Sequence, residues 1–172
     1  ALRNPCFSAI LCGTALLAPP ASAQSADGAG LLASTPQSIE DLQRIERQLQ
    51  QMLPRVLPAL VCIELNNGSG SGILVPGKTT AQNSNSDAGM AKITSQLNKK
   101  LPCVEKAEKM PRVGDCVFAL GHGGGLDRKR GPMVRLGRVV SLKNGIIQTD
   151  CKLIRGDSGG PLFNLDGKLI GI

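Results

Sequence analysis

The residues with the clearest chemical potential are 156–162, which read Gly-Asp-Ser-Gly-Gly-Pro-Leu. Glycines on both sides of Ser158 let the backbone turn tightly and expose the serine hydroxyl. Successive N–H groups in such a turn can converge and hold an oxyanion. The segment therefore predicts a nucleophilic serine in an acyl-transfer site. A plain turn or a phosphate-binding nest remains open as an alternative.

Short strands separated by turns are expected to position this serine. An apolar run over 59–65, a turn at Asn66-Asn67-Gly68 and a glycine-rich run over 68–75 predict a hairpin. Further strands are predicted at 90–93, 115–120, 133–142, 146–149, 161–165 and 168–172, with hairpin turns at Asn144-Gly145 and Asp166-Gly167 and a polar linker at 82–86. The pattern indicates an all-β, antiparallel protein.

One amphipathic helix is predicted before these strands, over residues 35–54. Apolar residues recur at helical spacing, Ser38 opens a segment that resembles a capping box, and Pro54 is expected to end the helix. Packing of this helix on its own domain is favoured. An oligomerisation or docking arm is the alternative.

The N-terminal residues 1–23 have the layout of a signal peptide. Arg3 precedes an apolar run over 7–18, and Ala21-Ser22-Ala23 supplies the small residues of a cleavage site. Residues 24–34 then predict a flexible leader, and no later stretch approaches the roughly 20 apolar residues of a membrane span. We therefore expect an exported protein, periplasmic or extracellular, without a membrane span.

Composition limits which partners, metal sites and covalent cross-links are expected. The 172 residues carry a net charge of +7, but they contain no Trp or Tyr for stacking on bases, so nucleic acid is not an expected partner. Four cysteines remain after the predicted signal peptide, namely Cys62, Cys103, Cys116 and Cys151. Their spacing does not favour zinc, and in an oxidising compartment we expect disulfides, with buried free thiols as the alternative.

The segment 156–162, with the residues that follow it to Gly171, resembles the nucleophile region of trypsin-like serine proteases. The HtrA-like (Deg-type) bacterial branch fits best, because residues 68–72 resemble its Gly-Ser-Gly-Ser-Gly strand and residues 113–121 its Val-Gly-Asp-x-Val-x-Ala-x-Gly strand. The resemblance implies a trypsin-like double β-barrel. Residues 55–172 would form a partial protease domain with an abridged first barrel.

The resemblance also implies roles for individual residues. Ser158 would be the nucleophile, and the N–H groups of Gly156 and Ser158 would form the oxyanion hole. Asp87 opens a segment similar to the family's aspartate strand and would orient a histidine; the alternative is a loop cap. Lys152, six positions before the serine, would lie at the base of a specificity pocket and favour an acidic side chain. No metal or organic cofactor is implied.

The sequence departs from the family pattern in lacking the expected histidine. Gly72 and Asp87 are 15 positions apart, which is roughly 50 Å of extended chain and too short to hold both the histidine loop and the returning strands. The single histidine, His122, lies in the loop 121–125. A relocated general base is one hypothesis for His122, and a structural place in that loop is favoured.

The implied function is that of a serine endopeptidase. Ser158 would attack peptide carbonyls of polypeptide substrates and form an acyl-enzyme. The missing histidine makes activity of this chain doubtful, because a serine hydroxyl needs a base to become a good nucleophile. The alternative is a catalytically inactive, protease-derived protein that binds peptides as a scaffold.

Overall fold

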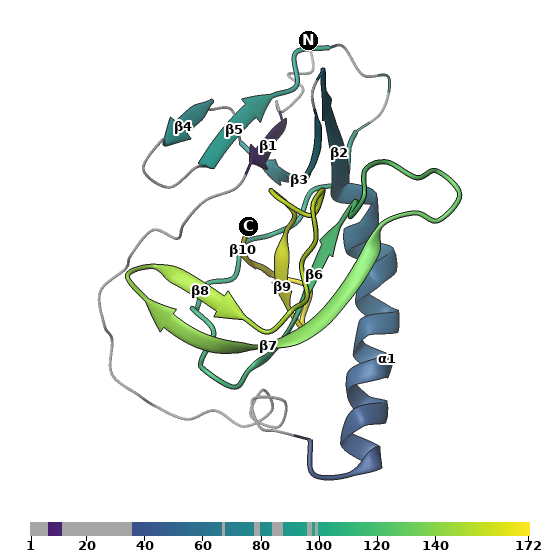
Figure 1. Cartoon of the computed structure of the whole chain (residues 1–172), viewed down its shortest axis with the longest axis vertical. Helices are drawn as coiled ribbons and strands as arrows, with labels where there is room; N and C mark the ends of the chain where they lie inside the picture. The colour runs from purple at the N-terminus through teal and green to yellow at the C-terminus, as the bar shows by residue number, and fades with distance from the viewer. Residues whose placement is uncertain are drawn as a thin grey trace.

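The computed structural model describes residues 7–11, 36–66, 68–77, 80–83, 88–95, 98 and 100–172. In these residues, two five-stranded antiparallel sheets are accompanied by one α-helix and one short 3₁₀ helix (Figure 1). The expected all-β architecture with one helix is confirmed. The predicted leader, 24–34, lies outside the described residues.

The first sheet has the strand order β2-β3-β1-β5-β4. It comprises β1 (Phe7–Leu11), β2 (Leu60–Leu65), β3 (Gly68–Pro76), β4 (Ala81–Asn83) and β5 (Ala88–Lys92). The predicted β2–β3 hairpin is present, with Leu65 paired to Gly68. Two features were not foreseen. The strand β1 forms from residues inside the predicted signal peptide, and Gln82 pairs with Gly89 in β4–β5 instead of lying in a linker.

The second sheet has the strand order β10-β9-β6-β7-β8. It comprises β6 (Cys116–Gly121), β7 (Met133–Lys143), β8 (Ile146–Thr149), β9 (Leu162–Asn164) and β10 (Leu169–Gly171). All five strands were predicted, within one or two residues at their ends. Asn144 and Gly145 have φ angles of 53° and 77°, as a type I′ hairpin turn requires.

The helix α1 spans Ile39–Val56, so it begins and ends later than predicted. Ser38 caps it, with its side chain accepting a hydrogen bond from the Asp41 N–H at 3.2 Å. Pro54 does not end the helix. Its ring is compatible with helical φ and removes only one hydrogen bond, so the helix continues for two residues before the 3₁₀ helix η1 (Leu57–Ala59). Among the described residues, no helix could cross a membrane.

The core lies between the two sheets and α1. The rings of Phe118 on β6 and Phe163 on β9 are fully buried and stack with centroids 5.2 Å apart. Ile45 and Val56 bring the apolar stripe of α1 onto this cluster, and Ile73 adds the first sheet. Because β6 is buried along its whole length, the loops at its ends are held on a rigid support.

The expected disulfides are absent among the described cysteines, all four of which are free thiols. Cys116 packs in the core cluster with Phe118, whereas Cys151 packs with Val117 and Val139 in a separate cluster. Val117 and Phe118 are neighbours on β6, so their side chains point to opposite faces of the sheet. The thiols of Cys116 and Cys151 therefore lie on opposite faces and cannot meet. Burial raises the pKa of both thiols, which keeps them protonated and unreactive.

Candidate active site

Ser158 lies on the loop that joins β8 to β9, where its side chain is exposed between buried Asp157 and buried Gly159. The loop depends on glycine at position 156. Gly156 has a φ of 100°, and a Cβ there would lie 2.5 Å from the carbonyl oxygen of His122. Any L-residue at this position would be strained in conformation and would collide with the neighbouring backbone.

Two carbonyl groups of the loop are fixed by hydrogen bonds. The Gly124 N–H donates to the Arg155 carbonyl at 2.7 Å, and the Gly160 N–H donates to the Asp157 carbonyl at 2.8 Å. In a planar trans peptide the N–H points opposite to the C=O. The N–H groups of Gly156 and Ser158 therefore point away from these anchors, and neither donates a hydrogen bond to any described residue.

Ser71 of β3 ties the serine loop to the first sheet. Its N–H donates to the Ser158 carbonyl at 2.7 Å, and its hydroxyl donates to the Gly156 carbonyl at 2.7 Å. The same hydroxyl oxygen accepts a hydrogen bond from the His122 N–H at 2.8 Å. Ser71 is fully buried. It therefore holds both residues of the predicted oxyanion hole through their carbonyl groups.

We expect Ser71→Ala to destabilise the protein and to loosen the serine loop. The Gly156 carbonyl and the His122 N–H would lose a buried partner, at about 1–3 kcal/mol for each group. Urea unfolding would measure the change. Ser69→Ala is the matched control, because Ser69 lies on the same strand and no described residue hydrogen-bonds to its hydroxyl. Equal stability of the two variants would contradict the assignment.

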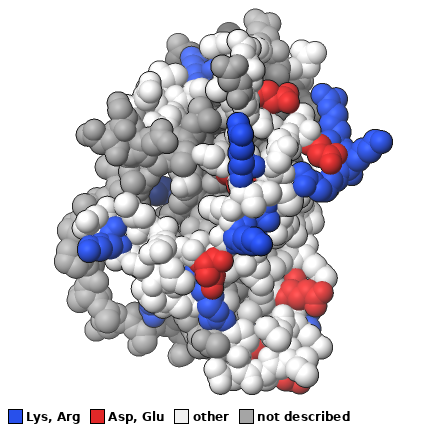
Figure 2. Space-filling view, viewed as in Figure 1, with Lys and Arg blue, Asp and Glu red and all other residues white. Residues whose placement is uncertain are grey.

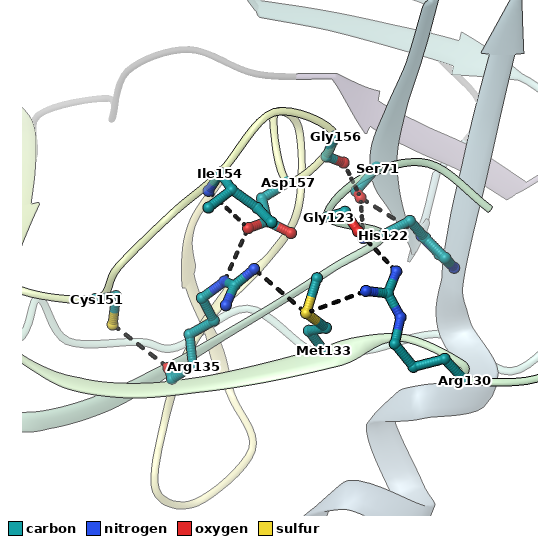
Figure 3. A network of polar contacts seen from close by, with 10 residues as sticks. All are labelled: Ser71, His122, Gly123, Arg130, Met133, Arg135, Cys151, Ile154, Gly156 and Asp157. Carbon is teal, nitrogen blue, oxygen red and sulfur yellow. Dashed lines mark hydrogen bonds and ion pairs between the residues drawn. The ribbon is translucent and has the colours of Figure 1, made fainter. Parts of the chain in front are cut away.

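A partly buried ion pair holds the loop from the other side (Figure 3). The Arg135 Nε of β7 lies 2.8 Å from the Asp157 Oδ2, and the side chains are 16% and 3% exposed. The same carboxylate oxygen accepts a hydrogen bond from the Ile154 N–H at 3.0 Å. The residue beside Ser158 is thus anchored to the second sheet, and the loop is held between the two sheets.

His122 is not placed as a general base for Ser158. The residue is 6% exposed, and its Nδ1 lies 3.4 Å from the Ser71 hydroxyl oxygen (Figure 3). No hydrogen bond is described between its ring and Ser158. Burial lowers the pKa of His122, with a smaller opposing effect from the negative charge of Asp157, so the ring is neutral at pH 7. The placement favours a structural role for this histidine.

A cleft of about 500 Å³ adjoins the serine loop and is lined by both halves of the fold. The β2–β3 hairpin contributes Glu64 and Ser69, the loop after β6 contributes Gly124 and Gly125, and Arg155 and Gly156 come from the serine loop itself. Its two charged residues have opposite signs. On the face that Figure 2 shows, basic side chains are likewise scattered among acidic ones, without one continuous basic patch.

The other predicted site residues do not join this arrangement. Asp87 lies outside the described residues. Lys152 is exposed and is not among the residues that line the cleft, so its predicted place in a specificity pocket stays a prediction. Sequence reasoning missed Ser71 and Arg135. The Gly-Ser-Gly-Ser-Gly motif marked Ser71, but only as part of a strand, and nothing near Arg135 in the chain indicates its partner.

An exposed serine on a glycine-rich loop between two β-sheets is the arrangement of a trypsin-like serine hydrolase. Residues 50–172 match the family model described as the trypsin-like peptidase domain. The chain belongs to this family.

Within the family, the chain is similar to Deg-type proteins. It is 34% identical over 118 residues to the periplasmic pH-dependent serine endoprotease DegQ of Escherichia coli, covering 65% of this chain and 25% of that protein. It is 35% identical over 120 residues to the periplasmic serine endoprotease DegP of Salmonella typhimurium, covering 66% of this chain and 24% of that protein. The chain thus spans about a quarter of the length of each of these relatives.

Solved structures show the same fold. A serine endoprotease from Yersinia pestis matches with a TM-score of 0.57 at 23% identity, covering 72% of this chain and 56% of that one. The structure of Deg5 matches with a TM-score of 0.57 at 20% identity, covering 74% of this chain and 84% of that one. The fold is therefore a trypsin-like double β-barrel with an abridged first barrel, as the sequence predicted.

Proposed function

We propose that the protein is a Deg-type serine endopeptidase by descent, and that this chain binds polypeptides and forms an acyl-enzyme on Ser158 but hydrolyses peptide bonds very slowly. The observation that supports this most is the serine loop, with an exposed Ser158 and two N–H groups that have no described partner. The names of the relatives, periplasmic serine endoproteases, support export to the periplasm. Residues 1–23 would then be removed as a signal peptide.

The reaction would start when the Ser158 Oγ attacks a substrate carbonyl carbon. The N–H groups of Gly156 and Ser158 would stabilise the resulting oxyanion, which is worth about 3–4 kcal/mol for one such donor in a comparable protease. The hydroxyl proton must go to a base, and the only histidine in the sequence is held beside Ser71. Solvent would have to accept that proton.

An activated peptide ester tests this function. The p-nitrophenolate group leaves without needing a proton, so acylation depends less on the missing base than amide hydrolysis does. We expect intact-mass spectrometry to show an acyl adduct on Ser158 that persists, because deacylation also needs a base to activate water. Ser158→Ala should show no adduct.

The scaffold alternative predicts a different outcome. A protease-derived binding protein would bind the peptide part of the ester in the cleft beside Gly156 without forming the adduct. Binding with no adduct on Ser158 would therefore favour the scaffold and overturn the proposed acyl-enzyme.

A further inference from the structure

The strand β1 occupies a position between two strands that are close in the chain. It pairs antiparallel with β3 on one side, from Phe7↔Pro76 to Ile10↔Ile73. On the other side it pairs antiparallel with β5, from Ser8↔Lys92 to Leu11↔Gly89. In Figure 1 the purple strand lies between β3 and β5. These two strands have no backbone pairing with each other.

The pairing shows how wide this position is. Neighbouring strands lie about 4.8 Å apart, so β3 and β5 are separated by about two such spacings, too far for direct hydrogen bonds. The β3 segment is fixed independently of β1, because β2 pairs with it as far as Ile73 and the Val104 N–H donates to the Leu74 carbonyl at 3.0 Å. Ile93, the residue directly after β5, packs against the core cluster. Without β1, a slot one strand wide would therefore remain between β3 and β5.

The residues around the slot define what it accepts. Ile73, Leu74 and Val75 of β3 are buried aliphatic residues, and β5 contributes Gly89 and Ala91. The residues that fill the slot, 7–11, read Phe-Ser-Ala-Ile-Leu and carry no charge. The slot therefore fits an extended, uncharged and mainly apolar segment of about five residues, held through its backbone.

We propose that the slot between β3 and β5 is a strand-acceptor site, which binds an extended apolar segment of another polypeptide when residues 7–11 are not in place. Addition of a strand to the open edge of a sheet is a common way to bind peptides. Here the bound segment would pair with both β3 and β5. Removal of residues 1–23 during export would vacate the slot. The site is separate from the Ser158 loop and does not depend on catalysis.

The full-length chain with Ala9→Pro tests the proposal. Proline removes a backbone N–H from the central strand β1 and should displace it. We expect a fluorescent peptide, Phe-Ser-Ala-Ile-Leu, to bind this variant about tenfold or more tightly than it binds the unchanged chain, whose slot is filled. Ala9→Gly keeps the N–H and is the matched control that should bind like the unchanged chain. The peptide Phe-Ser-Pro-Ile-Leu should not bind.

A melting experiment covers the case in which Ala9→Pro unfolds the first sheet. Saturating Phe-Ser-Ala-Ile-Leu should then restore folding and raise the Tm of the variant, since a ligand that binds only the folded state stabilises it. Equal affinity of the unchanged chain and of Ala9→Pro would overturn the proposal. So would an Ala9→Pro chain that neither binds the peptide nor refolds with it.

Discussion

The chain is expected to hydrolyse a fluorogenic peptide amide with a kcat about 10⁶-fold lower than that of E. coli DegQ, measured side by side. Loss of the triad histidine in a comparable protease has an effect of this size, and it corresponds to about 8 kcal/mol of activation free energy. The structural reason is that the single histidine, His122, is buried with its ring 3.4 Å from the Ser71 hydroxyl and makes no described hydrogen bond to Ser158.

Some peptide hydrolysis is expected to remain without a histidine base. The proposed oxyanion hole and substrate binding alone would give about 10³–10⁴ over the reaction in water. Ser158→Ala is the control, and it should remove whatever Ser158-dependent hydrolysis remains. A kcat within about a thousandfold of the DegQ value, lost in Ser158→Ala, would contradict the account, because another group would then have to take the serine proton.

Breaking the partly buried Arg135–Asp157 ion pair is expected to have the largest effect on stability. Arg135→Met would leave the Asp157 carboxylate, 3% exposed, without its counter-charge and should cost about 3–5 kcal/mol of unfolding free energy. The carboxylate would keep only the hydrogen bond from the Ile154 N–H, because its Oδ1 has no hydrogen-bond partner in the described part of the chain. Urea unfolding at pH 7 would measure it.

Two comparisons show whether the effect comes from the pair itself. Arg128→Met should change stability by no more than about 0.5 kcal/mol, because Arg128 is exposed and its side chain has no partner among the described residues. The double variant Arg135→Met/Asp157→Asn should recover part of the loss, since it removes the charge that was left unpaired. A single variant as stable as the unchanged chain would contradict the role of the pair.

The elements that the sequence predicted correctly are those with local signals. Asn144-Gly145 specifies a tight hairpin by its backbone preferences, and the structure has the positive φ angles that the turn needs. The strands β6 and β3 were predicted from equally local patterns, an apolar run and a glycine-rich run. Each pattern lies within a few residues of the element that it defines.

The features that the sequence could not predict depend on distant contacts. Ser71 and Gly156 are 85 positions apart, so the hydrogen bond between them has no signature in either segment. The Arg135–Asp157 pair is separated by 22 positions, and only the docking of β7 against the serine loop brings it together. Cys116 and Cys151 stay apart because they pack in different clusters on opposite faces of the sheet, which cysteine counting cannot reveal.

The central claim is that the backbone around Ser158 presents its hydroxyl beside N–H groups that have no partner among the described residues. A fluorophosphonate probe, followed by peptide mass spectrometry, tests it most directly, because attack on phosphorus releases fluoride and the N–H groups stabilise the product oxygen. The account predicts modification of Ser158 before any other serine, no modification in Ser158→Ala, and slower modification in Ser71→Ala than in Ser69→Ala. Modification spread evenly over exposed serines, or absent from Ser158, would contradict it.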